Sequence, residues 1–367
     1  DDTATVLRKI DAADGFPGVA DSLFGQTCHL FDAWPEATVR ARPGAVIARR
    51  ETALLRATVD GAVWIGHVKR ADSIKLPATL AFARESMSVP EARLESWWRA
   101  SSSTWQDIAY EEAGQAGFLH FEFYNGAMST VQCERLRAAL AWAKQRPVRI
   151  LVLMGGVDFW SNGIHLNVIE AASLGDGSAA DESWRNINAM NDLALELITT
   201  GQQLTVAALG GNTGAGGCFL ARAADLVWAR DAVILNPHYK NMGNLYGSEY
   251  WTYLLPRRVG ADTARAIMRD RQPLTAQRAV EIGFTDVCLA GDAQVFRIEV
   301  ARRAAELAAA PDFAENIAAK REARARDEAA KPLAAYREEE LTHLRRNFYG
   351  FDPSYHVARH HFVRKSP

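Results

Sequence analysis

The first quarter of the chain shows short apolar runs separated by turn residues. Four of these runs have the length and composition of β-strands, and they lie at residues 26–31, 45–49, 51–58 and 62–69. Asp60 and Gly61 separate the last two runs, and this pair favours a hairpin turn because glycine tolerates a positive φ. Together with one preceding helical stretch, these strands predict a small β-barrel over residues 1–75.

The pattern changes three times along the rest of the chain. Residues 76–116 contain prolines and no sustained periodicity, which predicts a linker with short helices. Over residues 117–310, apolar runs such as 148–154 alternate with segments of helical periodicity, as in an α/β domain with buried strands. Residues 311–367 are helical and polar, and we interpret their run of Lys, Arg and Glu as a solvated helix face.

Composition and charge exclude several classes of protein. The 367 residues are 48% hydrophobic and 23% charged, which is ordinary for a soluble globular chain. The net charge of −2 argues against a surface built for nucleic acid or an anionic membrane, although Arg40, Arg42, Arg49 and Arg50 keep RNA binding by residues 1–75 open. No apolar run is long enough to span a bilayer.

The cysteines and the N-terminus bear on where the protein works. The four cysteines are far apart and include no CxxC pair, so they predict reduced thiols in a cytoplasmic protein and neither disulfides nor zinc. The chain begins Asp-Asp-Thr without an initiator Met or a signal pattern, so we expect a piece of a longer protein. His356, His360 and His361 lie close in sequence, but no carboxylate or cysteine at ligand spacing accompanies them, and no metal is predicted.

Two glycine-rich stretches, at 155–167 and 210–219, each follow a predicted buried strand. The second opens a helix, where the first backbone N–H groups have no partner inside the helix. If the two loops meet, they can direct two N–H donors at one carbonyl oxygen, which makes an oxyanion hole. The glycines equally permit tight turns and close packing, and that reading stays open. The lysine and serine or threonine of a phosphate loop are missing.

A third stretch, at 235–251, is dense in titratable and aromatic residues directly after a strand. A tyrosine hydroxyl beside a carboxylate or a lysine can relay a proton, because hydrogen bonding shifts the pKa of either group. Tyr246, Tyr250 and Trp251 are equally well explained as packing residues of a helix.

Several segments resemble the crotonase (enoyl-CoA hydratase/isomerase) superfamily. They include GNTGAGGCFLARAAD at 211–225 and LTAQRAVEIGFTDV at 274–287. The strings DFWSNGIHLN, ESWRNINAMNDL and LNPHYKNMGNLYGSEYWTYLLPRR resemble one branch, the HypX/HoxX-type hydrogenase maturation factors. The resemblance covers roughly residues 117–367, while residues 1–75 resemble the C-terminal β-barrel subdomain of formyl-tetrahydrofolate-dependent formyltransferases. It implies an α/β crotonase-type ββα spiral with C-terminal helices, preceded by a small OB-like barrel.

The resemblance also implies an activity. Ile164 and Gly216 match the positions whose N–H groups form the crotonase oxyanion hole. Phe219 and Tyr239 stand where hydratases carry their two glutamates, so ordinary hydration is disfavoured. In the HypX/HoxX branch, Tyr239 and Glu249 match the proposed catalytic pair. The activity of that branch is the decomposition of formyl-CoA to CO and CoA, the CO becoming a ligand of the [NiFe]-hydrogenase iron.

The remaining site residues follow from their place beside these loops. We expect an acyl pocket lined by Asn162, His165, Asn236 and His238. We expect the CoA phosphates to contact Lys240, Arg257 and Arg258. Coenzyme A enters as formyl-CoA, and formyl-tetrahydrofolate only through a formyltransferase part absent from this chain. The expected partners are this small thioester and hydrogenase maturation proteins. A crotonase-type hydrolase or hydratase, or a non-catalytic CoA-binding scaffold, remains the alternative.

Overall fold

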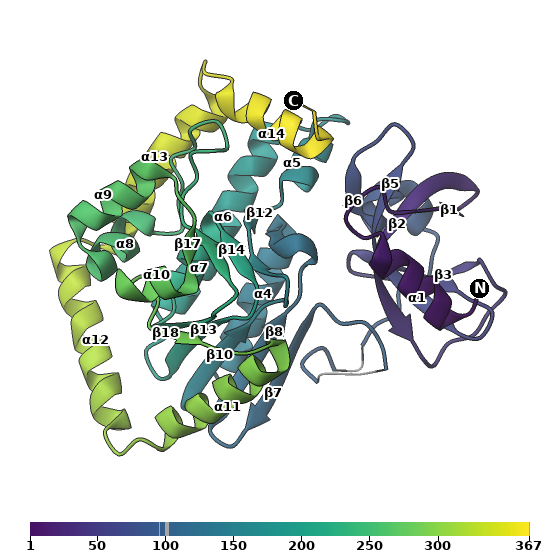
Figure 1. Cartoon of the computed structure of the whole chain (residues 1–367). Helices are drawn as coiled ribbons and strands as arrows, with labels where there is room; N and C mark the ends of the chain where they lie inside the picture. The colour runs from purple at the N-terminus through teal and green to yellow at the C-terminus, as the bar shows by residue number, and fades with distance from the viewer. Residues whose placement is uncertain (95, 100–102, 367) are drawn as a thin grey trace. The chain divides into compact units, whose positions relative to one another are not determined.

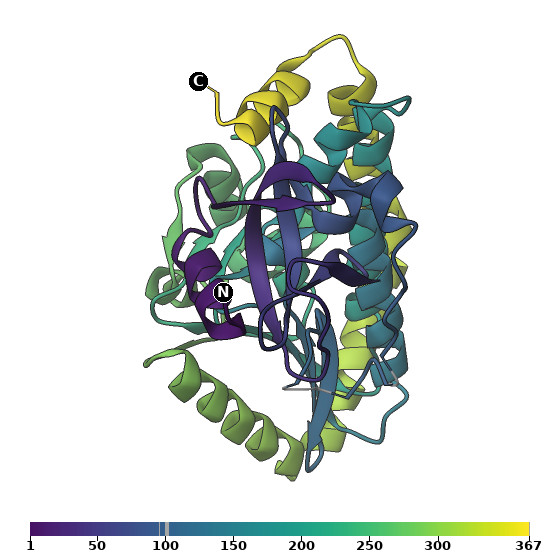
Figure 2. The ribbon, with the colours of Figure 1, turned by 90° about the vertical axis from the view of Figure 1, so that its right-hand side faces the viewer.

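The computed structural model describes residues 1–94, 96–99 and 103–366, and divides the chain into two units, residues 1–106 and 107–367 (Figure 1). The first unit begins with helix α1 (Thr3–Ala12), which packs beside strand β2 (Figure 2). Its other elements are β1 (Val19–Leu23), β2 (Gln26–Glu36), β3 (Val46–Arg50), β4 (Ala53–Ala57), β5 (Ala62–Arg70), β6 (Lys75–Pro77), α2 (Ala78–Ala81) and α3 (Ala83–Ser86).

The strands of the first unit form one sheet in the order β1-β2-β5-β4-β3, with β6 paired to β5. The predicted hairpin at Asp60-Gly61 joins β4 and β5, whose register pairs Ala57 with Ala62. The predicted barrel is wrong in one respect, because no ladder among the described residues joins β1 to β3 and closes the sheet. The core gathers small and aromatic side chains of β3, β4 and β5 around Trp64 and Trp105.

One arginine of the proposed RNA-binding patch is not available at the surface. Arg50 is buried, and its guanidinium lies 4.4 Å from the centre of the Trp64 ring. It donates to the carbonyl oxygens of Ala92 and Trp105 at 2.8 and 2.6 Å. Its role is therefore to satisfy buried backbone acceptors in this unit.

The second unit is built on a sheet in the order β18-β15-β13-β10-β8-β7, parallel except for β7. The strands are β7 (Ile108–Ala113), β8 (Ala116–Phe121), β10 (Ile150–Met154), β13 (Leu204–Leu209), β15 (Leu226–Arg230) and β18 (Val287–Leu289). Every residue of β10 is buried, as its continuous apolar run predicts. The predicted linker at 76–116 is wrong at its end, because β7 already belongs to this sheet.

Helices cover the two faces of this sheet. Ile150, Val152 and Met154 pack against α11 (Ala293–Ala309), so the alternate residues Leu151 and Leu153 face the opposite side. The other helices before it are α4 (Thr130–Ala143), α5 (Leu166–Ala172), α6 (Ala179–Ile198), α7 (Gly216–Arg222), α8 (Trp251–Val259), α9 (Ala261–Asp270) and α10 (Ala276–Glu281). None of the described helices combines the length and apolar content of a membrane span.

Short strands at the end of the main sheet position the glycine-rich loops. A small sheet runs β11-β14-β16-β17, and a separate pair joins β12 to β9. These strands are β9 (Ala127–Met128), β11 (Phe159–Ser161), β12 (Gly163–Ile164), β14 (Asn212–Gly214), β16 (Ile234–Asn236) and β17 (Leu274–Thr275), and a short 3-10 helix, η1 (Tyr124–Gly126), precedes β9.

The chain ends in three helices that wrap the second unit (Figure 1). They are α12 (Phe313–Ala330), α13 (Leu333–Tyr349) and α14 (Ser354–Arg364). Contacts tie α13 to α6 and α8, and α14 to α5. This part of the chain therefore stands over the elements that carry the candidate site.

Candidate active site

The two glycine-rich loops meet in the structure. Gly163, with φ +78°, lies so close to the start of α7 that a Cβ on it would stand 3.1 Å from the Gly216 nitrogen. A Cβ on Gly217 would stand 2.1 Å from the Ser161 carbonyl oxygen, so no side chain fits there. Ala215 precedes the helix with φ 47°, a conformation that L-residues rarely adopt. The Gly216 N–H opens the first turn of α7, where the helix supplies no acceptor.

Tyr239 and Glu249 form a buried pair beside these loops. The Tyr239 hydroxyl donates to Glu249 Oε2 at 2.6 Å and also lies 2.9 Å from the Ser248 carbonyl oxygen. The two side chains are only 6% and 1% exposed. Gly247 makes room for the phenol, since a Cβ there would stand 2.0 Å from the Tyr239 ring. The loop between β16 and α8 therefore brings together two residues ten positions apart.

The pair lies directly against the second glycine-rich loop. A Cβ on Gly216 would stand 2.3 Å from Glu249 Oε1, so only glycine allows the carboxylate this approach. Phe219 on α7 stacks on the Tyr239 ring, with centroids 5.3 Å apart and the planes inclined by 16°. A phenol, a carboxylate and a helix-opening amide thus lie next to one another.

Burial controls the protonation of this site. It raises the pKa of Glu249 to about 8, and it holds the pKa of the Tyr239 hydroxyl well above its usual value. No cation among the described residues pairs with the Glu249 carboxylate to offset this cost. The site therefore favours a protonated pair near neutral pH, which is an arrangement suited to holding and moving one proton.

Two polar residues that the sequence did not single out complete the network. Asn191 of α6 accepts the Glu249 N–H at 2.8 Å and the Ser248 hydroxyl at 2.7 Å. Glu340 of α13 accepts N–H groups of Tyr250 and Thr252 and is fully buried, with a pKa raised to about 7 by that burial.

The solvated helix face predicted within residues 311–367 is therefore wrong at Glu340. One signal in the sequence could have found it: Glu340 precedes Leu344 and Phe348 by four and eight residues, on the apolar stripe of α13.

The two asparagines predicted for the acyl pocket flank the second loop. A Cβ on Gly214 would stand 3.0 Å from Asn162 Oδ1 and 4.0 Å from the Asn236 Cβ. The Asn162 amide donates to the Asn125 carbonyl at 2.8 Å, and the Asn236 carbonyl accepts the Ala215 N–H at 3.0 Å. Both residues thus lie next to the loop that carries Gly216.

The two histidines differ in their surroundings. His165 caps α5, because its ring Nδ1 accepts the Val168 N–H at 3.3 Å. The backbone N–H of His165 donates to the Asn186 side-chain oxygen. His238 precedes Tyr239 and is buried, and the backbone of Arg271 lies next to its ring. Burial lowers the pKa of His238, so the ring is neutral at physiological pH. It can therefore form a polar wall without adding charge.

The three residues predicted to contact the CoA phosphates are not equivalent. Arg257 and Arg258, at the end of α8, form ion pairs with Asp327 and Asp286. Lys240, next to Tyr239 in the sequence, is half-buried, and none of the ion pairs among the described residues involves it. Of the three, Lys240 has the cation that a phosphate meets without breaking an existing contact.

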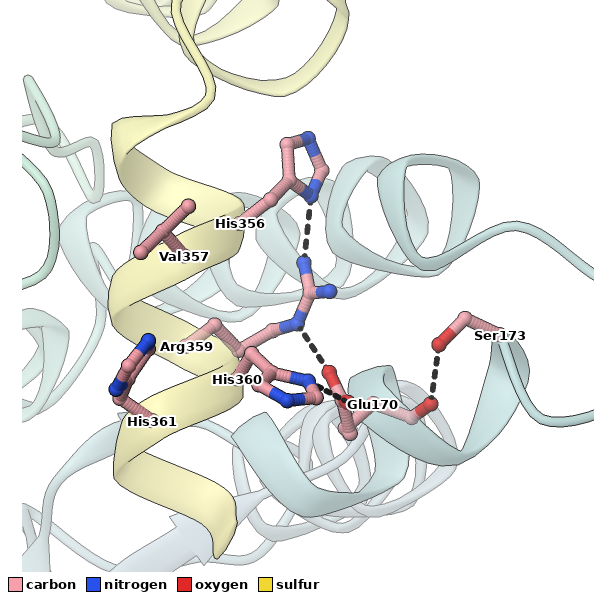
Figure 3. A pocket seen from close by; sticks show the side chains of 7 residues that line it. All are labelled: Glu170, Ser173, His356, Val357, Arg359, His360 and His361. Atoms are coloured by element: carbon pink, nitrogen blue, oxygen red, sulfur yellow. Dashed lines mark hydrogen bonds and ion pairs between the residues drawn. The ribbon is translucent and has the colours of Figure 1, made fainter. Parts of the chain in front are cut away.

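A separate cavity of about 330 Å³ lies between α5 and α14 (Figure 3). The Glu170 carboxylate accepts from Arg359 Nε and His360 Nδ1, both at 3.0 Å. His356, which the sequence groups with His360, instead bonds the Phe348 carbonyl and Arg359. The cavity is lined by Glu170, Ser173, His356, Val357, Arg359, His360 and His361.

Known proteins resemble the chain at three levels. A family model described as enoyl-CoA hydratase/isomerase matches residues 123–349. The hydrogenase maturation factor HoxX of Bradyrhizobium diazoefficiens is 53% identical over all of this chain and 63% of its own length. The crystal structure of HypX from Aquifex aeolicus in complex with tetrahydrofolic acid is 46% identical, with a TM-score of 0.95, and is covered over 65% of its length.

An enoyl-CoA hydratase of Bacillus halodurans shares the fold alone. It is 18% identical, with a TM-score of 0.60 over 70% of this chain and 99% of its own. The chain itself spans just under two thirds of HoxX and HypX. It belongs to the enoyl-CoA hydratase/isomerase family, and within that family it is a relative of the hydrogenase maturation factors HoxX and HypX.

Proposed function

We propose that this chain decomposes formyl-CoA to CO and CoA, and that the CO serves [NiFe]-hydrogenase maturation. The observation that carries the proposal is the Tyr239 hydroxyl donating over 2.6 Å to a buried carboxylate that has no paired cation. The relation to HoxX and HypX supports the destination of the CO. Formyl-tetrahydrofolate chemistry is assigned to the part of those relatives that this chain does not match.

The reaction needs one proton acceptor and one proton donor. The formyl C–H and C–S bonds break and one S–H bond forms, so that formyl-CoA gives CO and CoA with no water and no net proton. We assign protonation of the leaving sulfur to the Tyr239–Glu249 pair, which is protonated near neutral pH, and uptake of the formyl proton to the Glu249 carboxylate that remains, so that the pair regains its proton. The phenol can also turn toward the Ser248 carbonyl oxygen at 2.9 Å, which lets it accept from a protonated Glu249.

The surroundings suit this step better than hydration. Phe219 supplies an apolar ring where the resemblance places a hydratase glutamate, so no second carboxylate stands there to activate water. We assign the N–H groups of Ile164 and Gly216 to the formyl oxygen, which they hold in position relative to the pair. Asn162, Asn236, His165 and His238 are assigned to the walls of the acyl pocket, and Lys240 to the CoA phosphates.

The test measures CO from synthetic formyl-CoA by its binding to reduced myoglobin. Tyr239→Phe removes the hydroxyl and keeps the ring that stacks on Phe219, so CO release should fall by about 10²–10⁴-fold. Tyr246→Phe is the matched control, because Tyr246 lies in the same loop but stacks on His343 instead. Full activity of Tyr239→Phe, or formate in place of CO, contradicts the proposal.

A further inference from the structure

The segment that carries Glu249 has a disfavoured backbone. Glu249 and Tyr250 are consecutive left-handed residues, with φ of 58° and 60°. Neither is glycine, so both adopt this conformation only because neighbouring groups hold it. Tyr250 also precedes α8 without supplying a side-chain cap for the helix. Something outside the segment must therefore fix it.

The Glu340 carboxylate makes these contacts. Its Oε1 accepts the Thr252 N–H at 2.9 Å and the Thr252 hydroxyl at 2.6 Å. Its Oε2 accepts the Tyr250 N–H at 3.0 Å and lies 3.3 Å from the Ser248 hydroxyl. These partners stand on both sides of Glu249. We propose that Glu340 is a positioning residue of the reaction proposed above, holding residues 248–252 so that the Glu249 carboxylate meets the Tyr239 hydroxyl.

Helix α13 is itself anchored, which makes Glu340 a fixed support. One turn before it, Arg337 donates to Asp192 at 2.6 Å and to the Asn188 side chain at 2.9 Å. Both partners lie on α6, the helix whose Asn191 accepts the Glu249 N–H. The segment is therefore held between two helices that are joined to each other.

Both side-chain oxygens of Glu340 are needed as acceptors, because the Tyr250 N–H faces one of them and the N–H and hydroxyl of Thr252 face the other. Glutamine has the same size, but it replaces one acceptor oxygen with an NH₂ group. Whichever way it turns, that NH₂ faces either the Tyr250 N–H or the Thr252 N–H. Glu340→Gln thus removes one of the hydrogen bonds that fix residues 248–252, without opening a cavity.

The experiment compares Glu340→Gln with Glu339→Gln. Glu339 is the adjacent residue on α13, where it is exposed and pairs with Lys331, so its loss leaves the segment untouched. Glu340→Gln should lower kcat for CO release by about 10–100-fold with KM unchanged. It should also speed amide hydrogen exchange within residues 248–252. Glu339→Gln should change neither quantity.

A second variant keeps the proposal testable if Glu340→Gln fails to fold. Thr252→Val removes one hydroxyl donor to Glu340 and should lower kcat by a smaller factor, again at constant KM. Unchanged kcat and unchanged exchange in the folded variants overturn the proposal, as does a rise in KM alone. If the unmodified protein releases no CO, the proposed function fails, while hydrogen exchange still decides whether Glu340 holds the segment.

Discussion

Two glutamates of this chain are equally buried and are treated in opposite ways. Glu249 and Glu170 are 1% and 2% exposed. Glu249 faces a phenol and no cation, and its pKa is raised to about 8. Glu170 receives Arg359 and His360, whose hydrogen bonds hold the pKa of its carboxyl below the usual value. Burial alone does not decide the charge of a carboxyl, because the partners do.

The difference in pKa separates a carboxyl that can transfer a proton from one whose ion pair only stabilises the fold. A carboxyl that is protonated near neutral pH can take up and release a proton at little cost, as the Tyr239–Glu249 pair requires. A carboxylate locked by Arg359 is useless for that purpose, but it ties α14 to α5. Both regions lie under the C-terminal helices, which therefore serve the site through α13 and the fold through α14.

The largest expected effect is on catalysis. Glu249→Gln keeps a partner for the Tyr239 hydroxyl but cannot accept a proton, so CO release should fall by about 10²–10⁴-fold. Glu281→Gln, at an exposed pair with Arg278, is the control and should leave the rate unchanged. A Glu249→Gln variant with the full rate would mean that another group accepts the proton, and that Glu249 does not differ from Glu170 in function.

The next effect is on stability at the other glutamate. Glu170→Gln leaves the Arg359 guanidinium buried without a carboxylate, which should cost about 3–5 kcal/mol of unfolding free energy. Combining it with Arg359→Met removes the unpaired charge and should recover part of that loss. Urea unfolding measures both variants. A double variant no more stable than Glu170→Gln would show that the pair is not what joins α14 to α5.

The pH dependence of stability should have opposite signs at the two sites. Glu249 holds a proton in the folded state that the unfolded chain releases above its ordinary pKa of 4.5, so its contribution falls as pH rises from about 4.5 to about 8. Glu170, with a lowered pKa, stabilises above 4.5 and loses that contribution as pH falls through its folded value.

Urea unfolding between pH 4 and 8 tests both signs. Glu249→Gln should flatten the decline in stability toward pH 8, while Glu170→Gln should differ least from the unmodified protein at the acid end. Parallel curves for all three proteins would mean that neither carboxyl is perturbed as its surroundings indicate.

The local features of the fold could be predicted from the sequence. The continuous apolar run ending at Met154 became a strand buried on both faces, and the hairpin at Asp60-Gly61 formed as its turn chemistry requires. The glycine-rich loops could be located from the sequence, but their meeting was left open there, since it joins residues more than fifty positions apart, such as Gly163 and Gly216. The buried strand and the hairpin turn depend on neighbours within a few residues, whereas the contact between the loops does not.

The features that were predicted wrongly depend on contacts with residues far away in the sequence. Glu340 looks like any glutamate of a charged helix until α13 packs over residues 248–252, some ninety positions away. The sequence analysis assigned the residues of β7 to a linker, because the second half of this strand, Glu111–Ala113, is exposed and has no apolar pattern. Roles set by such distant contacts are invisible to periodicity, which reports only which face of an element is buried.

The smallest expected effect extends the comparison from carboxylates to cations with and without an ion-pair partner. Arg257 already binds Asp327, as Arg359 binds Glu170, whereas no carboxylate in the part of the chain that the structure describes pairs with Lys240, which follows Tyr239. A cation without a carboxylate partner can contact a phosphate without breaking an ion pair, but a paired cation must first give up its carboxylate. Lys240→Ala should therefore raise KM for formyl-CoA by about 3–10-fold with kcat retained, and Arg257→Ala should leave KM nearly unchanged. The reverse order would mean that the Arg257–Asp327 pair opens when CoA binds, and that an ion pair seen without ligand does not mark a cation as unavailable.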